Sequence, residues 1–122
     1  MKIQFEDERP IFVQIAKQIE DGILAGAFPE ETQIPSTTEI SVNYKINPAT
    51  ALKGINLLVD GGIVYKKRGL GMFVSKGAVK VLDEKRKEEF YDNYIVRLAA
   101  EAKKLHISQG EIVSMIERGY DQ

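Results

Sequence analysis

The sequence contains no cysteine and a single histidine. Without cysteine the chain can form no disulfide framework, no zinc site built on sulfur and no thiol nucleophile. The one imidazole, that of His106, cannot supply the ligands of a usual catalytic metal centre, and no sequence pattern orients it against a nucleophile. We therefore expect a protein that is not an enzyme and that uses neither a metal nor another cofactor.

Long apolar runs are also absent. No run approaches the roughly 18 residues of a membrane span, and the start, MKIQFEDERP, lacks the basic-then-apolar order of a signal peptide. These features predict a cytoplasmic protein that does not contact a membrane. The 122 residues are 43% hydrophobic and 29% charged, which is the composition of one folded domain, or of a small domain with an appendage.

The net charge of −1 gives no sign of a polyanionic partner, but the charge is unevenly distributed. Residues 1–37 hold three basic and seven acidic side chains, whereas residues 38–77 hold six basic and two acidic ones. Attraction to phosphate depends on local charge, so the basic middle segment favours one face that meets a nucleic acid. A chance cluster of surface lysines is the alternative, because the excess is modest.

Two helices are predicted in the first part of the chain. Residues 10–25 carry isoleucines at helical spacing, with Pro10 in the first turn. Ser36 with Glu39 three residues later forms a capping box, in which each side chain satisfies a backbone amide of the other residue, and this predicts the start of a second helix. Between the two helices, the pair Gln33-Ile34 allows only a very short extended pairing.

A third helix and a hairpin follow. Asn47 followed by Pro48 predicts a helix start, and the helix ends at the glycine pair 61–62. Residues 63–75 contain two short β-prone runs joined by a turn at 68–71. Three helices followed by a hairpin is the order of a winged helix-turn-helix, so the predicted fold class is mainly α with a β-hairpin wing.

After Gly77 the sequence predicts a long helix from near Asp83 to near Leu105 and a short final helix that begins with a capping box at Ser108. The long helix carries an apolar heptad seam, formed by Tyr91, Ile95, Leu98, Ala102 and Leu105. Two such helices bury too little surface to be stable alone. We therefore divide the chain into a winged-helix domain, 1–77, and a helical segment, 78–122, which packs either on that domain or on a second subunit.

The run from Pro10 to Val74 resembles the DNA-binding domain of GntR-family bacterial transcription regulators. The resemblance rests on four motifs in order: PIFVQI at 10–15, IPSTTEIS at 34–41, INPATALKGINLL at 46–58 and GIVYKKRGLGMFV at 62–74. The Asn47-Pro48-x-Thr50 start and the short helical tail are similar to the YtrA-like branch, whose members lack the large effector-binding domain of their relatives. The resemblance implies regulation of a nearby transporter operon.

Helix-turn-helix geometry and this resemblance place the expected DNA contacts at three sites. The start of the second helix offers amide dipoles to a phosphate, the third helix reaches base edges in the major groove, and the basic wing suits the minor groove. The candidate residues are Ser36, Thr37, Thr38, Lys45, Asn47, Pro48, Ala49, Thr50, Lys53, Lys67, Arg68 and Gly69. The alternative is that the polar residues only cap and solvate helices and that the wing is a plain hairpin turn.

Three positions depart from the family pattern. The family usually carries at position 38 an arginine that is expected to contact DNA, and here Thr38 can bond a phosphate but cannot select guanine with a bidentate contact. Leu52 and Leu57 stand where relatives often carry polar groups. Either they pack on a neighbouring molecule or they are simply exposed.

The prediction is therefore a repressor that binds a near-palindromic site on double-stranded DNA as a homodimer through the helical segment. Two other classes stay open: a winged-helix adaptor that contacts only proteins, and a small enzyme without a recognised motif. The basic residues Lys45, Lys53, Lys67 and Arg68 fall at groove-facing and wing positions, which an adaptor need not keep positive. The sequence names neither an effector nor the operator.

Overall fold

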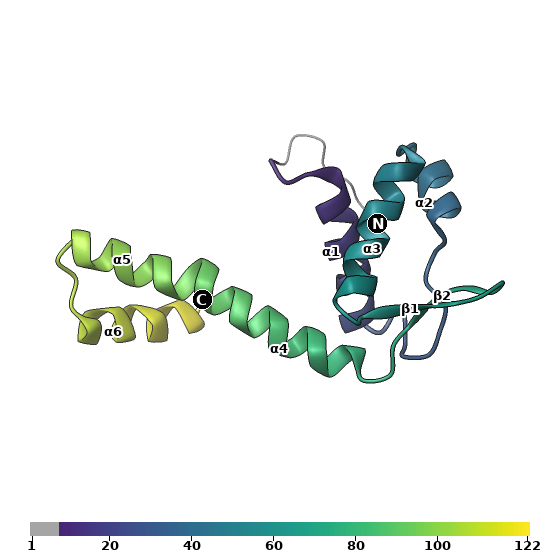
Figure 1. The fold of residues 1–122 in the computed structure, drawn as a ribbon. Helices are drawn as coiled ribbons and strands as arrows, with labels where there is room; N and C mark the ends of the chain where they lie inside the picture. The colour runs from purple at the N-terminus through teal and green to yellow at the C-terminus, as the bar shows by residue number, and fades with distance from the viewer. Residues whose placement is uncertain (1–7) are drawn as a thin grey trace. The chain divides into compact units, whose positions relative to one another are not determined.

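The computed structural model describes residues 8–122, and its contacts divide the chain after Glu84 into two compact units. We call residues 8–84 the first unit and residues 85–122 the second unit. In the first unit the elements follow the predicted winged-helix order (Figure 1). They are α1 (Ile11–Leu24), α2 (Thr37–Tyr44), α3 (Pro48–Asp60), β1 (Val64–Lys67), β2 (Gly71–Val74) and the beginning of α4 (Ala78–Phe90).

The starts of α2 and α3 follow from the predicted caps. The Ser36 hydroxyl accepts a hydrogen bond from the Glu39 amide at 3.0 Å, and the Glu39 carboxylate accepts one from the Ser36 amide at 3.2 Å. The Asn47 side chain accepts from the Ala49 amide at 2.8 Å, and Pro48 is the first helical residue. At α1 the prediction is off by one position, because Pro10 is the cap itself, with φ −54° and ψ 147°.

The hairpin pairs β1 with β2 in antiparallel register, from Val64 opposite Val74 to Lys67 opposite Gly71. The segment before α2 lies along β2: the Ile34 amide donates to the Met72 carbonyl at 2.9 Å, and Gln33 forms an isolated bridge to Phe73. The short extended pairing predicted for Gln33 and Ile34 is thereby confirmed. It ties the loop after α1 to the base of the hairpin.

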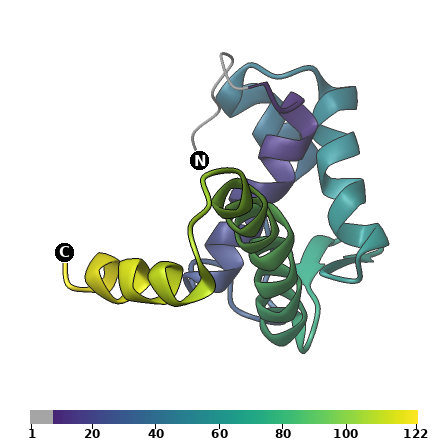
Figure 2. The ribbon, with the colours of Figure 1, turned by 90° about the vertical axis from the view of Figure 1, so that its left-hand side faces the viewer.

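A continuous aliphatic core holds the first unit together. α1 and α3 pack side by side in both views (Figures 1 and 2), and Gly54 permits their close approach. A Cβ atom at Gly54 would lie 2.9 Å from both the Ile15 side chain and the Phe12 carbonyl oxygen. The largest fully buried side chains of this core are Ile15, Ile19, Ile23, Ile34, Ile40, Ile55, Leu58, Ile63, Leu82, Val64 and Val74.

Helix α4 begins at Ala78, five residues before the predicted start near Asp83. The reason is a contact distant in sequence: the Glu30 carboxylate accepts hydrogen bonds from the amides of Gly77 at 2.7 Å and Val79 at 3.2 Å, which satisfies amide groups at the start of the helix. Ala78 and Leu82 are buried with the first core. The contacts accordingly divide the chain after Glu84, whereas the sequence places the boundary at Gly77.

The second unit contains the rest of α4, a π-helical segment η1 (Tyr91–Ile95), α5 (Val96–Lys104) and α6 (Gln109–Tyr120). The capping box predicted at Ser108 is present, with both hydrogen bonds to Glu111 at 3.2 Å. The long helix predicted to end near Leu105 is interrupted by the π turn of η1, and α5 ends at Lys104. All residues of this unit are described, and only Ala102 is buried.

Candidate nucleic-acid interface

Helix α3 separates a buried face from an exposed one. Ala51, Gly54, Ile55 and Leu58 are buried against the core, so the opposite side of the helix faces solvent. Of the predicted contact residues in its first two turns, Pro48, Ala49 and Lys53 are exposed and Thr50 is half-buried. Asn47 is exposed as well, but its side-chain oxygen is engaged in the cap. This exposed amino-terminal part of α3 has the accessibility that major-groove reading requires.

Helix α2 continues to Tyr44, so only residues 45–47 connect it to α3. Lys45 caps the carboxyl-terminal end of α2 in the left-handed conformation, with φ 53° and ψ 48°, and its side chain is exposed. The Ser41 hydroxyl donates to the carbonyl of the buried Ile46 at 2.7 Å, which holds this turn against the core. Nothing in the local sequence marks Lys45 for a left-handed conformation, since asparagine or glycine is the usual choice there.

The start of α2 contributes one exposed hydroxyl. Ser36 and Thr37 are half-buried, and the Ser36 hydroxyl is occupied by the capping box, whereas Thr38 is exposed. A groove of about 390 Å³ runs between the start of α2, the side of α3 and the hairpin. Its lining includes Thr38, Leu52, Asn56, Lys66 and Met72. Of the predicted contact residues, only those at the start of α2 line this groove, whereas the predicted residues of α3 and of the wing tip do not. The exposed polar residues that α3 and the hairpin contribute to it are Asn56 and Lys66, which the prediction did not include.

Lys53 leans toward α1. Its amine nitrogen lies 4.1 Å from the centre of the Phe12 ring, which is the geometry of a cation–π contact. The ring holds the positive charge beside the exposed end of α3. Sequence reasoning missed Phe12, because a residue on α1 gives no local signal that it will meet a lysine on α3.

The wing carries its charges on an ordered turn. The Lys67 amine lies 4.3 Å from the Phe73 ring centre, while Arg68 and Gly69 are exposed at the tip, with Gly69 at φ +79°. The Gln33 side-chain amide donates to the Leu70 carbonyl at 2.8 Å. Gln33, which lies outside the hairpin sequence, therefore braces the wing turn.

Acidic groups behind the hairpin have structural partners. The Tyr65 hydroxyl donates to the Glu31 carboxylate at 2.7 Å, and this bond raises the pKa of Tyr65 above its usual value. The backbone amides of Gly77 and Val79 lower the pKa of Glu30, because they stabilise the charged carboxylate. These two glutamates are thus engaged in holding the loop after α1 to the hairpin and to α4.

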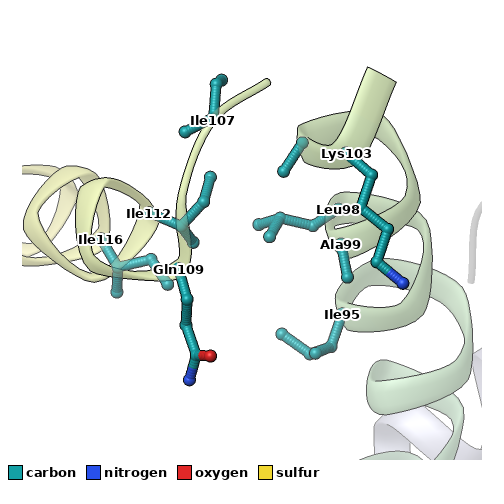
Figure 3. A pocket seen from close by; sticks show the side chains of 9 residues that line it. Ile95, Leu98, Ala99, Lys103, Ile107, Gln109, Ile112 and Ile116 are labelled. Atoms are coloured by element: carbon teal, nitrogen blue, oxygen red, sulfur yellow. The ribbon is translucent and has the colours of Figure 1, made fainter. Parts of the chain in front are cut away.

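The predicted seam in the second unit is only partly assembled. A groove of about 370 Å³ lies between α5 and α6, and Figure 3 shows side chains from both helices pointing into it. Ile95, Leu98 and Ala102 from the seam line this groove, whereas Tyr91 and Leu105 do not. The full lining is Ile95, Leu98, Ala99, Ala102, Lys103, Ile107, Gln109, Ile112 and Ile116.

Residues 8–122 lack two further features. No group of three or more histidine, aspartate or glutamate side chains in this range is placed to hold a metal ion. No helix in the same range is both long enough and apolar enough to cross a membrane.

Comparison with protein families matches residues 12–74 to the model described as "Bacterial regulatory proteins, gntR family". The chain is 28% identical over 119 residues to the HTH-type transcriptional regulator YhcF of Bacillus subtilis, covering 96% of this chain and 95% of that protein. It is 30% identical over 84 residues to the transcriptional repressor YtrA of the same organism, covering 69% of this chain and 65% of YtrA. The chain thus spans nearly all of one relative and just under two thirds of the other.

Solved structures agree with these matches. A regulator assigned to the GntR family from Bacteroides thetaiotaomicron superposes with a TM-score of 0.78 at 34% identity, covering 91% of this chain and 96% of that one. The DNA-binding domain of AraR in complex with its operator ORX1 superposes with a TM-score of 0.56 at 25% identity, covering 62% of this chain and 96% of that one. The winged-helix fold and the YtrA-like resemblance predicted from the sequence are confirmed.

Proposed function

This chain belongs to the GntR family of bacterial regulatory proteins, and from that premise we propose that it represses transcription by binding an operator as a homodimer. The observation that carries the proposal is the groove of the first unit, around which α2, α3 and the basic hairpin present exposed polar groups. A neighbour with this fold is bound to operator DNA. The residues we assign to contact DNA are those predicted from the sequence.

The division of labour among these residues follows from their positions. Thr50 and Lys53 on α3 are assigned to base edges and adjacent phosphates in the major groove. Arg68 and Gly69 at the wing tip are assigned to the minor groove, where close backbone approach and positive charge are favourable. Lys45, exposed before α3, is assigned to a phosphate.

The homodimer is supported by the second unit, which has almost no core of its own. Its groove between α5 and α6 is apolar and open to solvent (Figure 3), and a second copy would cover it. A two-fold dimer presents two recognition helices, so we propose a near-palindromic site with half-sites about 34 Å apart, or a multiple of this spacing. The YtrA-like resemblance suggests that the protein controls a transporter operon. We place the protein in the cytoplasm. No effector is assigned.

The direct experiment is a gel shift of the full-length protein on the DNA upstream of its own gene, at several salt concentrations. If about three cations per subunit meet phosphates, the logarithm of the affinity should fall against the logarithm of the salt concentration with a slope near −5, from about −0.9 per phosphate. Failure to bind this region or any duplex selected from a random library would reject the proposal. Footprinting should then show two protected half-sites.

Two substitutions separate the kinds of contact. Arg68→Ala at the wing should weaken binding to all sequences alike and flatten the salt slope, because this contact carries little base information. Thr50→Ala should cost about 1 to 3 kcal/mol on the preferred site if its hydroxyl reads a base, and should affect all sequences alike if it bonds only a phosphate. The exposed Lys80 on α4 provides a control, since Lys80→Ala removes a charge outside the assigned contacts.

Thr38→Arg tests the departure from the family pattern. This substitution restores the side chain usual at that position, so affinity should rise for operator variants that carry guanine in reach of α2. Binding to a panel of single-base variants measures the effect. If a folded dimer with Arg at this position shows unchanged affinity and unchanged preference, the start of α2 does not face the major groove.

A further inference from the structure

The side chains that α3 exposes near its start are mainly apolar. Pro48, Ala49 and Leu52 are exposed and carry no hydrogen-bonding group, while the Lys53 amine is drawn over the Phe12 ring. Specific reading of DNA by hydrogen bonds needs side chains such as arginine, asparagine or glutamine at the base edges. The exposed start of this helix therefore offers apolar side chains beside a few polar ones, among them Thr50 and Asn56.

Leu52 stands out on this surface. It is 48% exposed, and it differs from the similarly exposed Leu57 on the same helix by its place in a groove. It lines the groove of the first unit together with Thr38 from α2 and Lys66 from the hairpin. Each of the three elements assigned to DNA thus contributes to the wall around this leucine.

The charge around Leu52 indicates what covers it. Lys66 is exposed and lines the groove, and the amino-terminal end of α2 lines it as well, with Thr38 exposed. Lys66 attracts phosphate through its charge, and the exposed Thr38 hydroxyl can donate a hydrogen bond to a phosphate oxygen. An apolar protein surface would gain nothing from these groups, whereas a DNA duplex satisfies them while its base edges approach Leu52.

Only one apolar group lies on the major-groove edges of the base pairs, and this is the C5 methyl of thymine. We propose that Leu52 is a specificity-determining residue that packs against a thymine methyl in each half-site of the operator. The proposal rests on the proposed function, since it requires the groove of the first unit to face DNA. It replaces recognition by a polar group at this position, such as relatives often carry, with recognition by apolar contact.

Deoxyuridine isolates the methyl group, because it pairs as thymine does and differs only in lacking that methyl. We would select a preferred duplex from a random-sequence library with the full-length protein. Each thymine would then be replaced in turn by deoxyuridine, first in one half-site and then at the symmetry-related position in both half-sites. At one symmetric position, uridine in a single half-site should weaken binding by about fourfold, the effect of losing one buried methyl. Uridine in both half-sites should weaken it by about the square of that factor.

Protein variants connect the methyl to Leu52. Leu52→Ala should weaken binding to the thymine duplex and bind the thymine and uridine duplexes equally. Leu57→Ala is the matched control, because Leu57 lies on the same helix, is 42% exposed and does not line the groove. This control should keep the full preference for thymine. Thermal melting followed by circular dichroism checks that both variants fold, as exposed positions should permit.

The outcomes separate the two proposals. If the protein selects a specific duplex but uridine changes its affinity less than twofold at every position, Leu52 does not read a methyl and the proposed function stands. If uridine weakens binding and Leu52→Ala retains that effect, another residue reads the methyl and the inference is wrong. If Leu52→Ala dissociates the dimer, Leu52 is covered by a second copy. If no duplex is selected, both proposals fail.

Discussion

The two units of this chain differ in how they bury their apolar side chains. In the first unit, isoleucines of α1 and aliphatic residues of α2, α3 and the hairpin are fully buried in one core. In the second unit only Ala102 is buried, while Leu98, Val113, Met115 and Ile116 are at least 36% exposed. The first unit therefore has the packing of a self-sufficient domain. The second has helix caps suited to folding, but it leaves exposed the apolar surface that the proposed dimer would cover.

The largest effect should come from charging the groove of the second unit. Ile95→Asp combined with Leu98→Asp places carboxylates where the proposed dimer buries apolar surface, so the dimer dissociation constant should rise by orders of magnitude in favour of monomers. Light scattering measures the mass of the full-length protein, and the melting transition of the first unit should persist. The control is Ala100→Asp combined with Lys104→Asp, on the same helix but outside the groove.

If the wild-type protein is a monomer at tens of micromolar, the apolar surface of the second unit is not covered by a second copy. If the Ile95 and Leu98 substitutions unfold the whole chain, the groove packs against the chain's own core, and the two units do not differ in packing as described.

Replacing one isoleucine by alanine in each unit tests the difference in packing between the two units. Ile19→Ala, at a site that is 1% exposed, should lower the free energy of unfolding of the first unit by about 2 to 5 kcal/mol. Ile112→Ala, at a half-buried site of the groove, should instead shift the dimer dissociation constant and leave the first unit's stability unchanged. Chemical denaturation and analytical ultracentrifugation measure the two quantities. Equal losses of first-unit stability would show that the two units share one core.

Close packing in the first unit predicts a smaller loss from an added methyl group. Gly54→Ala places a Cβ atom 2.9 Å from the backbone oxygen of Phe12, and backbone cannot move aside as a flexible side chain does. The expected loss is about 1 to 3 kcal/mol, against the usual gain from replacing a helical glycine by alanine. Gly119→Ala in the second unit is the control, because nothing lies within 4 Å of the added atom. It should be neutral or stabilising.

The smallest effect concerns Glu30. Its pKa is lowered in the folded protein by the amides of Gly77 and Val79, so its contribution to stability is present above the unfolded pKa, near 4.5, and is lost as the pH falls through the folded value. Glu30→Gln should therefore lower the melting temperature at pH 7, and the difference from wild type should shrink below pH 4.5. Glu84→Gln at an exposed position should show no such trend. A difference independent of pH would contradict this role for the carboxylate.

The sequence predicted the features that local chemistry determines. Ser36 with Glu39, Asn47 with Pro48 and Ser108 with Glu111 lie within three residues of each other, so their patterns fix helix starts without help from the rest of the fold. The order of these elements was sufficient to predict the winged helix. The positions of individual contacts were not predictable in this way.

The features that were missed depend on distant residues or on altered helix geometry. The start of α4 depends on Glu30, which is 47 residues from Gly77. The seam assumed a regular helix, but the π turn, in which the Val96 amide donates to the Tyr91 carbonyl, adds a residue to the turn and displaces Tyr91 from the spacing of the heptad. Leu105 lies at the end of α5 as its cap and not within it.

The Gln33 side chain that braces the wing has a consequence for conformational entropy. A flexible loop loses freedom when it binds, and that loss subtracts from the affinity that its contacts provide. Here the hydrogen bond from Gln33 to the Leu70 carbonyl and the strand pairing of β1 with β2 order the turn before any partner arrives. In the proposed complex the wing would therefore meet DNA preorganised, and the free energy of its few charged contacts would be retained as affinity.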